Sequence, residues 1–366
     1  MTTYLLAGGG TAGHVNPLLA VADRLRERHP DATILVLGTK EGLEARLVPE
    51  RGYELLTIDR VPLPRRPNRA ALRFPARLRN TIESVREIIR ERQVDVVVGF
   101  GGYVSAPAYL AARAEKVPLA IHEANARPGV ANRLGARFTP HVGTAFAGTR
   151  IRGGQVVGMP LRREIEQLNR FESRREGIQF FGLDERKPTL LVTGGSSGAK
   201  RINDTISQAI ILILGAGWQV IHVTGEYREA IDDPKLAGYL VLKYADRMDL
   251  ALAVADLALT RAGTATVAEL CALGIPAVFV PYAVGNGEQR FNARGAVDAG
   301  GAVIVDDAAF TLDWVRSGLV PLLRNRARIA DMAARIATVG TLDGTDRMVD
   351  LVDRAVSAVP PGKLRG

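Results

Sequence analysis

The stretch Leu5-Leu6-Ala7-Gly8-Gly9-Gly10-Thr11-Ala12-Gly13-His14 decides the fold class of this chain. An apolar strand pattern turns through glycines toward an amphipathic helical pattern, which begins the alternating unit of a parallel α/β sheet. The glycines let the backbone come close to a ligand, and free N–H groups at a helix start favour an anion. Pro17 suits a first helical position, so we expect the helix to span residues 17–28.

The same alternation of strands and helices continues to both ends of the 366 residues and predicts two Rossmann-like doubly wound domains. We expect strands at 4–7, 32–37, 54–58, 95–99, 119–122 and 155–157, and again at 189–193, 219–223, 241–243, 257–260, 277–280 and 302–305. The charged segment 162–187 lacks a strand pattern, so we expect domains at residues 1–160 and 161–343. Residues 344–358 form a helical pattern that would pack back on the first domain. Two such sheets would place ligands in a cleft between their strand ends.

Composition excludes several protein classes. Apolar residues make up 47% and charged residues 24%, which is ordinary globular usage. The one cysteine, Cys271, excludes a disulfide framework and a cysteine-based zinc site. No run approaches the roughly 18 apolar residues of a bilayer span, and Met1-Thr2-Thr3 carries no basic residue, so we expect neither a membrane span nor a secretory signal.

Positive charge is concentrated in the first half of the chain. Residues 1–160 hold 23 Lys and Arg against 14 Asp and Glu, which accounts for the whole net charge of +9. Residues 60–92 alone contain ten Arg and three Glu. This density indicates a polyanionic surface as partner, although an ordinary solvated helix face would also carry it.

The first glycine stretch also satisfies the G-x-G-x-x-G pattern of dinucleotide-binding proteins, through Gly8, Gly10 and Gly13. That pattern requires an acidic residue at the end of the second strand to hold a ribose. Here the second strand ends Val36-Leu37-Gly38-Thr39-Lys40, without an acid. The nicotinamide-enzyme alternative is therefore weakened.

Two further glycine turns follow strands of the second half. Thr193-Gly194-Gly195-Ser196-Ser197-Gly198-Ala199-Lys200 lacks Walker A spacing but could face a phosphate, or be a structural turn. In the turn from Arg261 to Glu269, Thr264 or Thr266 could cap a helix. Glu269 would lie about one turn inside that helix, where it could accept two ribose hydroxyls. A simple capping arrangement explains this turn as well.

Taken together, these motifs resemble the MurG family of bacterial peptidoglycan glycosyltransferases. The likeness extends from Tyr4 to about Val356. It rests on four strings in the family's order: 8–14 (GGGTAGH), 122–125 (HEAN), 194–199 (GGSSGA) and 261–269 (RAGTATVAE). The resemblance implies a two-domain GT-B fold. It also implies transfer of N-acetylglucosamine from UDP-N-acetylglucosamine to undecaprenyl-diphospho-N-acetylmuramoyl-pentapeptide.

The resemblance also implies site residues. In the first domain, Thr11, Ala12, Gly13 and Asn125 would face donor or acceptor. Arg162 would reach the nucleotide, Ser196 the donor phosphate and Ala245 the uracil. Glu269 would hold the ribose, within the turn formed by Thr264, Ala265, Thr266, Val267 and Ala268. Gln289 would bind sugar hydroxyls, with the neighbouring Glu288 as the alternative.

Transfer with inversion requires a base, a stabilised leaving group and fixed orientation. His14 is the candidate general base, because imidazole titrates near neutral pH and a helix start disfavours its protonated form. A purely structural histidine is the alternative. No D-x-D pair stands in a suitable loop, since Asp232-Asp233 precedes Pro234 and Asp306-Asp307 ends a strand. We therefore expect no cofactor and no obligatory metal.

Three other functions remain as alternatives. They are a GT-B enzyme with a different lipid or small-molecule acceptor, a sugar-nucleotide epimerase, and a non-catalytic nucleotide-binding protein. The strings Gly101-Gly102-Tyr103 and 122–125 favour the peptidoglycan acceptor over the first of these. The epimerase would need carboxylates around the anomeric centre that the sequence does not place.

The basic segment predicts where the protein works. We expect peripheral binding to the cytoplasmic face of the cell membrane, no nucleic acid, and a cell-wall synthesis assembly as a further candidate partner. Prolines 62, 64, 67 and 75 predict a loop that leads into a helix at 80–92. The apolar residues expected to enter the headgroup layer are Val61, Leu63, Leu72, Phe74 and Leu78, between Arg65, Arg66, Arg69, Arg73, Arg77 and Arg79.

Overall fold

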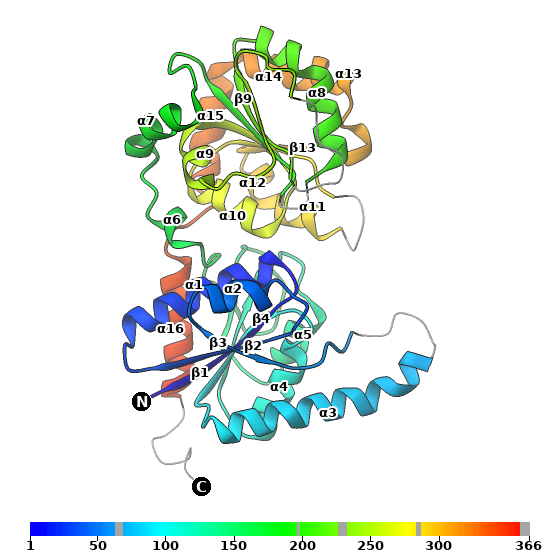
Figure 1. Cartoon of the computed structure of the whole chain (residues 1–366), viewed down its shortest axis with the longest axis vertical. Helices are drawn as coiled ribbons and strands as arrows, with labels where there is room; N and C mark the ends of the chain where they lie inside the picture. The colour runs from blue at the N-terminus through cyan, green and yellow to red at the C-terminus, as the bar shows by residue number, and fades with distance from the viewer. Residues whose placement is uncertain (63–68, 196–197, 226–232, 283–286, 359–366) are drawn as a thin grey trace. The chain divides into compact units, whose positions relative to one another are not determined.

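The computed structural model describes residues 1–62, 69–195, 198–225, 233–282 and 287–358. The chain divides into two compact units (Figure 1). Unit 1 comprises residues 1–162 together with the chain from Leu342 onward, and unit 2 comprises Arg163–Thr341. Each unit is built on its own parallel sheet.

Unit 1 contains seven parallel strands in the order β3-β2-β1-β4-β5-β6-β7. Their bounds are β1 (Thr3–Gly8), β2 (Thr33–Gly38), β3 (Glu54–Thr57), β4 (Val96–Gly101), β5 (Leu119–Glu123), β6 (Val142–Thr144) and β7 (Gly154–Val156). Strands β1 and β4 are nearly continuous apolar runs, and β5 begins with one, because helices cover both faces of the sheet. The three-residue β6 escaped the sequence analysis, since Val142-Gly143-Thr144 is too short to show a pattern.

The helices of unit 1 are α1 (Ala12–Arg28), α2 (Glu44–Glu50), α3 (Arg69–Glu91), α4 (Ser105–Ala114), α5 (Val130–Gly135) and α16 (Gly344–Ser357). The C-terminal helix α16 lies beside α1 (Figure 1). Its Met348, Val349 and Val352 are fully buried in the core of this unit. Arg28 of α1 donates to Asp350 at 2.5 Å and to Asp346 at 2.6 Å, which fixes the pairing of the two helices.

Unit 2 contains six parallel strands in the order β10-β9-β8-β11-β12-β13. Their bounds are β8 (Thr189–Thr193), β9 (Gln219–Val223), β10 (Tyr239–Leu242), β11 (Ala255–Thr260), β12 (Ala277–Phe279) and β13 (Ala302–Ile304). The six predicted strands of the second half are thus confirmed to within two residues at each end.

Helices and short helical turns surround this second sheet. They are α6 (Arg163–Glu166), α7 (Arg170–Phe181), α8 (Lys200–Gly215), α9 (Met248–Val254), α10 (Thr264–Ala272), α11 (Glu288–Asn292), α12 (Arg294–Asp298), η1 (Asp307–Ala309), α13 (Leu312–Trp314), η2 (Val315–Leu319), α14 (Val320–Arg324) and α15 (Arg326–Ile336). Buried Ile202, Ile206 and Ile213 of α8 pack on one face of the sheet with Trp218.

Two helix starts differ from the prediction, and both involve proline. Helix α1 begins at Ala12, so Pro17 lies inside it and not at the first helical position. Helix α3 begins at Arg69 and includes Pro75, so the predicted loop is wrong for residues 69–79. Pro62 does lie outside any helix, while Pro64 and Pro67 lie outside the described residues. Each proline removes one N–H donor from the helix, close to its N-terminal end. The helix-forming residues on both sides outweigh that local loss.

The residues predicted to face the membrane differ in their solvent exposure. Val61 is only 7% exposed, so its predicted place in the headgroup layer is wrong: it is a core residue. Phe74 and Leu78 are half-buried, whereas Leu72 is 83% exposed. Residues 63–68, which include Leu63, Arg65 and Arg66, lie outside the described residues. Within the described ranges, no helix is both long and apolar enough to cross a bilayer.

Candidate active site

The strand order places both glycine loops at corresponding points of the two sheets. In unit 1 the order reverses between β1 and β4, which end at Gly8 and Gly101. In unit 2 it reverses between β8 and β11, which end at Thr193 and Thr260. Parallel sheets bind ligands beyond the carboxyl ends of the strands at such a reversal. Each unit therefore presents a glycine loop where a ligand is expected.

The loop of unit 1 leads directly into α1. Thr11 is the N-cap residue, and its side chain makes no capping hydrogen bond. Ala12, Gly13 and His14 form the first helical turn, which contains no acidic residue. The N–H groups of this turn make the helix start electropositive, which suits an anionic ligand and disfavours a protonated imidazole.

His14 is oriented by the backbone of the loop. Its Nδ1 lies 3.2 Å from the Gly9 carbonyl oxygen and 3.2 Å from Thr11 Oγ1. A carbonyl oxygen only accepts, so the first contact is a hydrogen bond when Nδ1 carries the proton. In that tautomer Nε2 holds the lone pair, which is the form that a general base requires.

A buried carboxylate beneath the loop, that of Glu44, was missed by the sequence analysis. Glu44 is 0% exposed and accepts from Gly10 N at 2.8 Å and from Thr39 N at 3.0 Å. The Thr39 hydroxyl also donates to it, at 2.8 Å. Burial raises the pKa of Glu44, but the hydrogen bonds from Gly10 and Thr39 outweigh burial and lower the pKa overall. Residues 38–42 (GTKEG) contain a glycine at each end. These glycines are the one sequence feature that could have indicated a side chain packed closely against the backbone here.

A polar network lies at the carboxyl end of β5. Glu123 is buried and accepts from Asn125 N at 2.9 Å, Gly129 N at 2.9 Å and Asn132 Nδ2 at 2.9 Å. The hydroxyl of Tyr109 donates to Asn132 Oδ1 at 2.7 Å. The backbone that carries Asn125 is therefore fixed by a carboxylate, while the Asn125 side chain remains partly exposed.

His122, next to Glu123 in β5, belongs to this network because its carbonyl accepts from Asn132 Nδ2 at 3.1 Å. Its Nε2 lies 3.0 Å from the Gly158 carbonyl, and its buried Nδ1 has no partner within the described structure. Burial lowers the pKa of His122 to about 4, and the nearby His14 contributes in the same direction. His122 is therefore neutral near pH 7. His14 also lies close to Gly101, because a Cβ on Gly101 would stand 3.1 Å from His14 Nε2.

The glycine loop of unit 2 closes on itself. Gly195 N donates to Thr193 Oγ1 at 3.2 Å, and Gly198 N donates to the Gly195 carbonyl at 2.9 Å. The loop leads into the 16-residue helix α8, whose N-cap Ala199 offers no side-chain cap. This helix start suits a phosphate. Ser196, the residue predicted to bind the phosphate, lies outside the described residues.

The third glycine turn starts α10. Gly263 is the N-cap and Thr264 the first helical residue, so the prediction that Thr264 or Thr266 caps the helix is wrong. Glu269 lies in the second turn and is partly exposed, with Ala265, Thr266, Val267 and Ala268 between. Arg261, at the end of β11, donates to the Val280 carbonyl at 2.9 Å and pairs with Asp307. It thereby ties together the carboxyl ends of neighbouring strands.

The other predicted site residues lie in separate segments. Ala245 is buried in the turn between β10 and α9. Gln289, in α11, accepts from Tyr282 N at 2.8 Å through Oε1. Arg162 is the last residue of unit 1 before α6 and is partly exposed. The predicted contacts of these residues with a ligand remain predictions.

Comparison with known proteins identifies the family. The chain is 61% identical to a UDP-N-acetylglucosamine--N-acetylmuramyl-(pentapeptide) pyrophosphoryl-undecaprenol N-acetylglucosamine transferase of Leifsonia xyli subsp. xyli, over 98% of this chain and 100% of the relative. This chain belongs to the MurG family.

Further matches agree with this membership and with the GT-B fold. A relative of the same name from Streptomyces coelicolor is 48% identical, over 97% of this chain and 98% of its own length. The crystal structure of Acinetobacter baumannii MurG superposes with a TM-score of 0.78 at 28% identity, covering 97% of this chain and 100% of that one. Residues 4–144 match the glycosyltransferase family 28 N-terminal domain, and 189–348 match its C-terminal domain.

In this MurG-family chain, the three described residues of the two acidic pairs, Asp233, Asp306 and Asp307, each form an ion pair with a basic side chain. Asp307 accepts from Arg201 at 3.0 Å as well as from Arg261, and Asp306 pairs with Arg290. Asp233 accepts from Lys235 N at 2.9 Å in a turn, while Asp232 lies outside the described residues. No three metal-binding side chains gather at one point in the part of the chain that is described.

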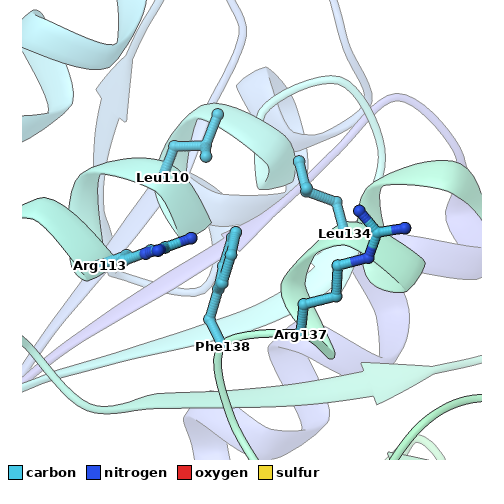
Figure 2. A pocket seen from close by; sticks show the side chains of 5 residues that line it. All are labelled: Leu110, Arg113, Leu134, Arg137 and Phe138. Carbon is cyan, nitrogen blue, oxygen red and sulfur yellow. The ribbon is translucent and has the colours of Figure 1, made fainter.

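A pocket of about 570 Å³ lies in unit 1, lined by α4, α5 and the segment that follows α5 (Figure 2). Its lining comprises Leu110, Arg113, Leu134, Arg137 and Phe138. The Arg113 guanidinium lies over the Phe138 ring at 4.5 Å. Arg113 is in the last turn of α4, and Phe138 precedes β6. The pocket therefore borders the amino ends of the strands, and no predicted site residue lines it.

Proposed function

We propose that this chain transfers N-acetylglucosamine from UDP-N-acetylglucosamine to the 4-hydroxyl of undecaprenyl-diphospho-N-acetylmuramoyl-pentapeptide, with inversion at the anomeric carbon. The observation that carries the proposal is 61% identity over essentially the full length of a transferase of that name. The glycine loops at both strand-order reversals support it, because a diphosphate-linked donor and a diphosphate-linked acceptor each need an anion site.

Unit 1 activates the acceptor in this proposal. His14 Nε2 takes the proton of the attacking hydroxyl while Nδ1 stays hydrogen-bonded to the Gly9 carbonyl. The electropositive start of α1 disfavours the protonated form of the imidazole. Thr11, Ala12, Gly13 and Asn125 position the substrates through backbone and amide groups around this base.

Unit 2 binds the donor. The turn 194–198 and the start of α8, with Ser196, stabilise the charge that develops on the departing UDP. Arg162, the last residue of unit 1, adds a cation for the nucleotide. Glu269 accepts the two ribose hydroxyls, and the buried turn at Ala245 receives the uracil. Gln289 uses Oε1 to hold Tyr282, so its amide nitrogen is the group that donates to the sugar.

A transfer assay tests this proposal. Purified chain, the lipid-linked muramoyl acceptor and UDP-N-acetylglucosamine should yield a disaccharide lipid with a β-1,4 bond, together with one UDP per transfer. Replacing the donor by UDP-glucose, or the acceptor by undecaprenyl phosphate, should abolish transfer. Formation of an epimerised UDP-sugar without transfer would instead favour the epimerase alternative.

The site of action is a second part of this proposal: peripheral binding to anionic lipid at the cytoplasmic face of the membrane. Leu72 of α3 is 83% exposed, and Arg73, Arg77 and Arg79 on the same helix are exposed as well. Further along, Arg86 and Arg90 pair with Glu83 and Glu115, so the charge available to lipid lies in the first half of α3. Each arginine near an anionic surface contributes about 1 kcal/mol.

Vesicle sedimentation tests membrane binding. Phosphatidylglycerol vesicles should bind the chain, with less binding as salt rises, and changing Arg73, Arg77 and Arg79 to Glu should reduce binding at least tenfold. The matched control changes three exposed arginines of unit 2, Arg324, Arg326 and Arg328, to Glu and should retain binding. Equal losses in both variants would show that net charge alone, and not α3, governs the interaction.

A further inference from the structure

One peptide group in the glycine loop has a charged group at one end and the candidate base at the other. The N–H of Gly10 donates to Glu44 Oε2 at 2.8 Å. The carbonyl of Gly9, the other half of the same peptide, lies 3.2 Å from His14 Nδ1. Glu44 and His14 are therefore joined in series through the Gly9–Gly10 peptide, although they are thirty residues apart in the sequence.

The packing around this peptide is close. A Cβ on Gly9 would overlap the Glu44 carboxylate, and a Cβ on Gly102 would stand 2.5 Å from the Gly9 carbonyl oxygen. Gly10 and Gly102 have φ of +89° each, which only glycine adopts without strain. The orientation of the peptide is thus fixed from both sides, by the carboxylate below and by the backbone after β4 beside it.

We propose that Glu44 is a positioning residue for His14, acting through the Gly9–Gly10 peptide. A carboxylate on the N–H end of a peptide polarises the group and makes its carbonyl oxygen a stronger acceptor. A stronger acceptor at Gly9 favours the His14 tautomer with the proton on Nδ1 and keeps the ring directed by that bond. Nε2 is then the basic nitrogen. The peptide does here what a carboxylate in direct contact does for a catalytic histidine.

The catalytic consequence rests on the proposed function, in which His14 is the base. The tautomer consequence does not, because it concerns the free protein. The rival explanation is that Glu44 only fills space under the loop and stabilises the fold. The two explanations differ in whether His14 itself changes when the carboxylate is altered.

The first experiment needs no altered carboxylate. Two-bond ¹H–¹⁵N correlation spectra of the full chain, labelled at its five histidines, distinguish protonation on Nδ1 from protonation on Nε2, and His14→Ala assigns the signal. At a pH where His14 is neutral, we expect the Nδ1–H form. A predominant Nε2–H form would overturn the proposal.

The second experiment changes the carboxylate. Glu44→Gln has one acceptor oxygen for three donors, so the Gly10 and Thr39 groups can no longer all be satisfied. We expect a mixture of His14 tautomers and a kcat for transfer reduced about tenfold, as when the outer partner of a ligating histidine is removed. The KM for UDP-N-acetylglucosamine should change less than about twofold.

The matched control is Asp95→Asn. Asp95 Oδ2 accepts from Thr3 N at 2.8 Å, so it is a carboxylate on a backbone N–H at the other end of the same strand, β1. This variant should lose stability but keep the Nδ1–H tautomer and the wild-type kcat. If Glu44→Gln loses stability and likewise keeps both, the proposal is wrong and Glu44 is structural.

Two further outcomes keep the test independent of folding and of the proposed function. If Glu44→Gln does not fold, Gly102→Ala displaces the Gly9 carbonyl from its far side, and an unchanged tautomer there would overturn the proposal. If His14→Ala transfers at the wild-type rate, the proposed base is wrong. The spectra would still decide whether Glu44 controls the tautomer.

Discussion

The two glycine loops occupy the same place in two similar sheets, yet they differ in what holds them. The loop of unit 1 rests on the buried carboxylate of Glu44 and fixes a histidine. The loop of unit 2 is closed by its own Thr193 hydroxyl and Gly195 carbonyl and leads into α8. The first arrangement suits proton transfer and the second suits a phosphate. The comparison indicates that the strand-order reversal supplies the position, and the residues beneath each loop supply the chemistry.

Removal of the base should have the largest effect. We expect His14→Ala to lower kcat by about 10²–10⁴-fold, the usual contribution of general base catalysis, with little change in KM for UDP-N-acetylglucosamine. Steady-state transfer kinetics at saturating acceptor measure this. A kcat within twofold of wild type would show that His14 is not the base, and that the loop of unit 1 does not have the proposed role in proton transfer.

The donor side should respond differently. Glu269→Ala is expected to raise the KM for UDP-N-acetylglucosamine by about 10–100-fold, because two charge-assisted hydrogen bonds to the ribose would be lost. The KM for the lipid acceptor should stay within about twofold. If instead the acceptor KM rises while the donor KM is unchanged, Glu269 does not belong to the nucleotide site.

Much of this comparison could be predicted from the sequence. Parallel strands buried on both faces leave apolar runs such as Val96–Val98, and glycines mark where each strand turns into a helix. Glu44 could not be found in this way, because its partners are backbone groups brought together only by the fold. Glu44 lies in α2, beyond the end of the second strand, and accepts from the glycine loop and from Thr39, so the dinucleotide pattern does not predict it.

The predicted starts of three helices also differ from the structure, because local residue preferences were outweighed by the rest of the helix or by the backbone before it. Proline marks a favourable first position, but Pro17 and Pro75 lie inside α1 and α3, where packing along the whole helix outweighs one lost hydrogen bond. The predicted caps at Thr264 and Thr266 are wrong for a related reason. Gly263 already has the extended backbone of an N-cap, and the threonines follow it in the helix.

An added methyl group should lower the free energy of unfolding more in the loop of unit 1 than in the loop of unit 2. Gly9→Ala places a methyl group against the buried Glu44 carboxylate and should cost about 3 kcal/mol in the free energy of unfolding. Gly195→Ala has open space around the new Cβ and costs only the strain of φ +84°, about 1 kcal/mol. Urea unfolding of both variants measures the difference. Equal losses would mean that Glu44 moves aside without cost.

The smallest of the expected effects is a loss of folding stability in both units as the pH falls. Burial lowers the pKa of His122 in unit 1 and of His222 in unit 2 to about 4. Below pH 6.5 the unfolded chain binds protons that the folded chain does not, so stability is present above that pH and is lost as the pH falls. Between pH 7.5 and 5.5 each histidine should remove on the order of 1 kcal/mol.

Further acidification should then remove the contribution of Glu44 to the stability of unit 1. The folded pKa of Glu44 is lowered, so its contribution to unit 1 is present above the unfolded value of 4.5 and is lost as the pH falls below it. Urea titrations at each pH, with Glu44→Gln as reference, measure this contribution. A variant with the same acid sensitivity as wild type would contradict it.

The division of labour between the units is tested most directly by measuring donor binding and single-turnover transfer in the same two variants. We predict that His14→Ala binds UDP-N-acetylglucosamine with the wild-type dissociation constant, measured calorimetrically, but transfers the sugar at least a hundredfold more slowly. Glu269→Ala should bind the donor at least tenfold more weakly and transfer at nearly the wild-type rate once saturated. Weakened donor binding in His14→Ala, with an unimpaired rate for the bound donor, would contradict the account.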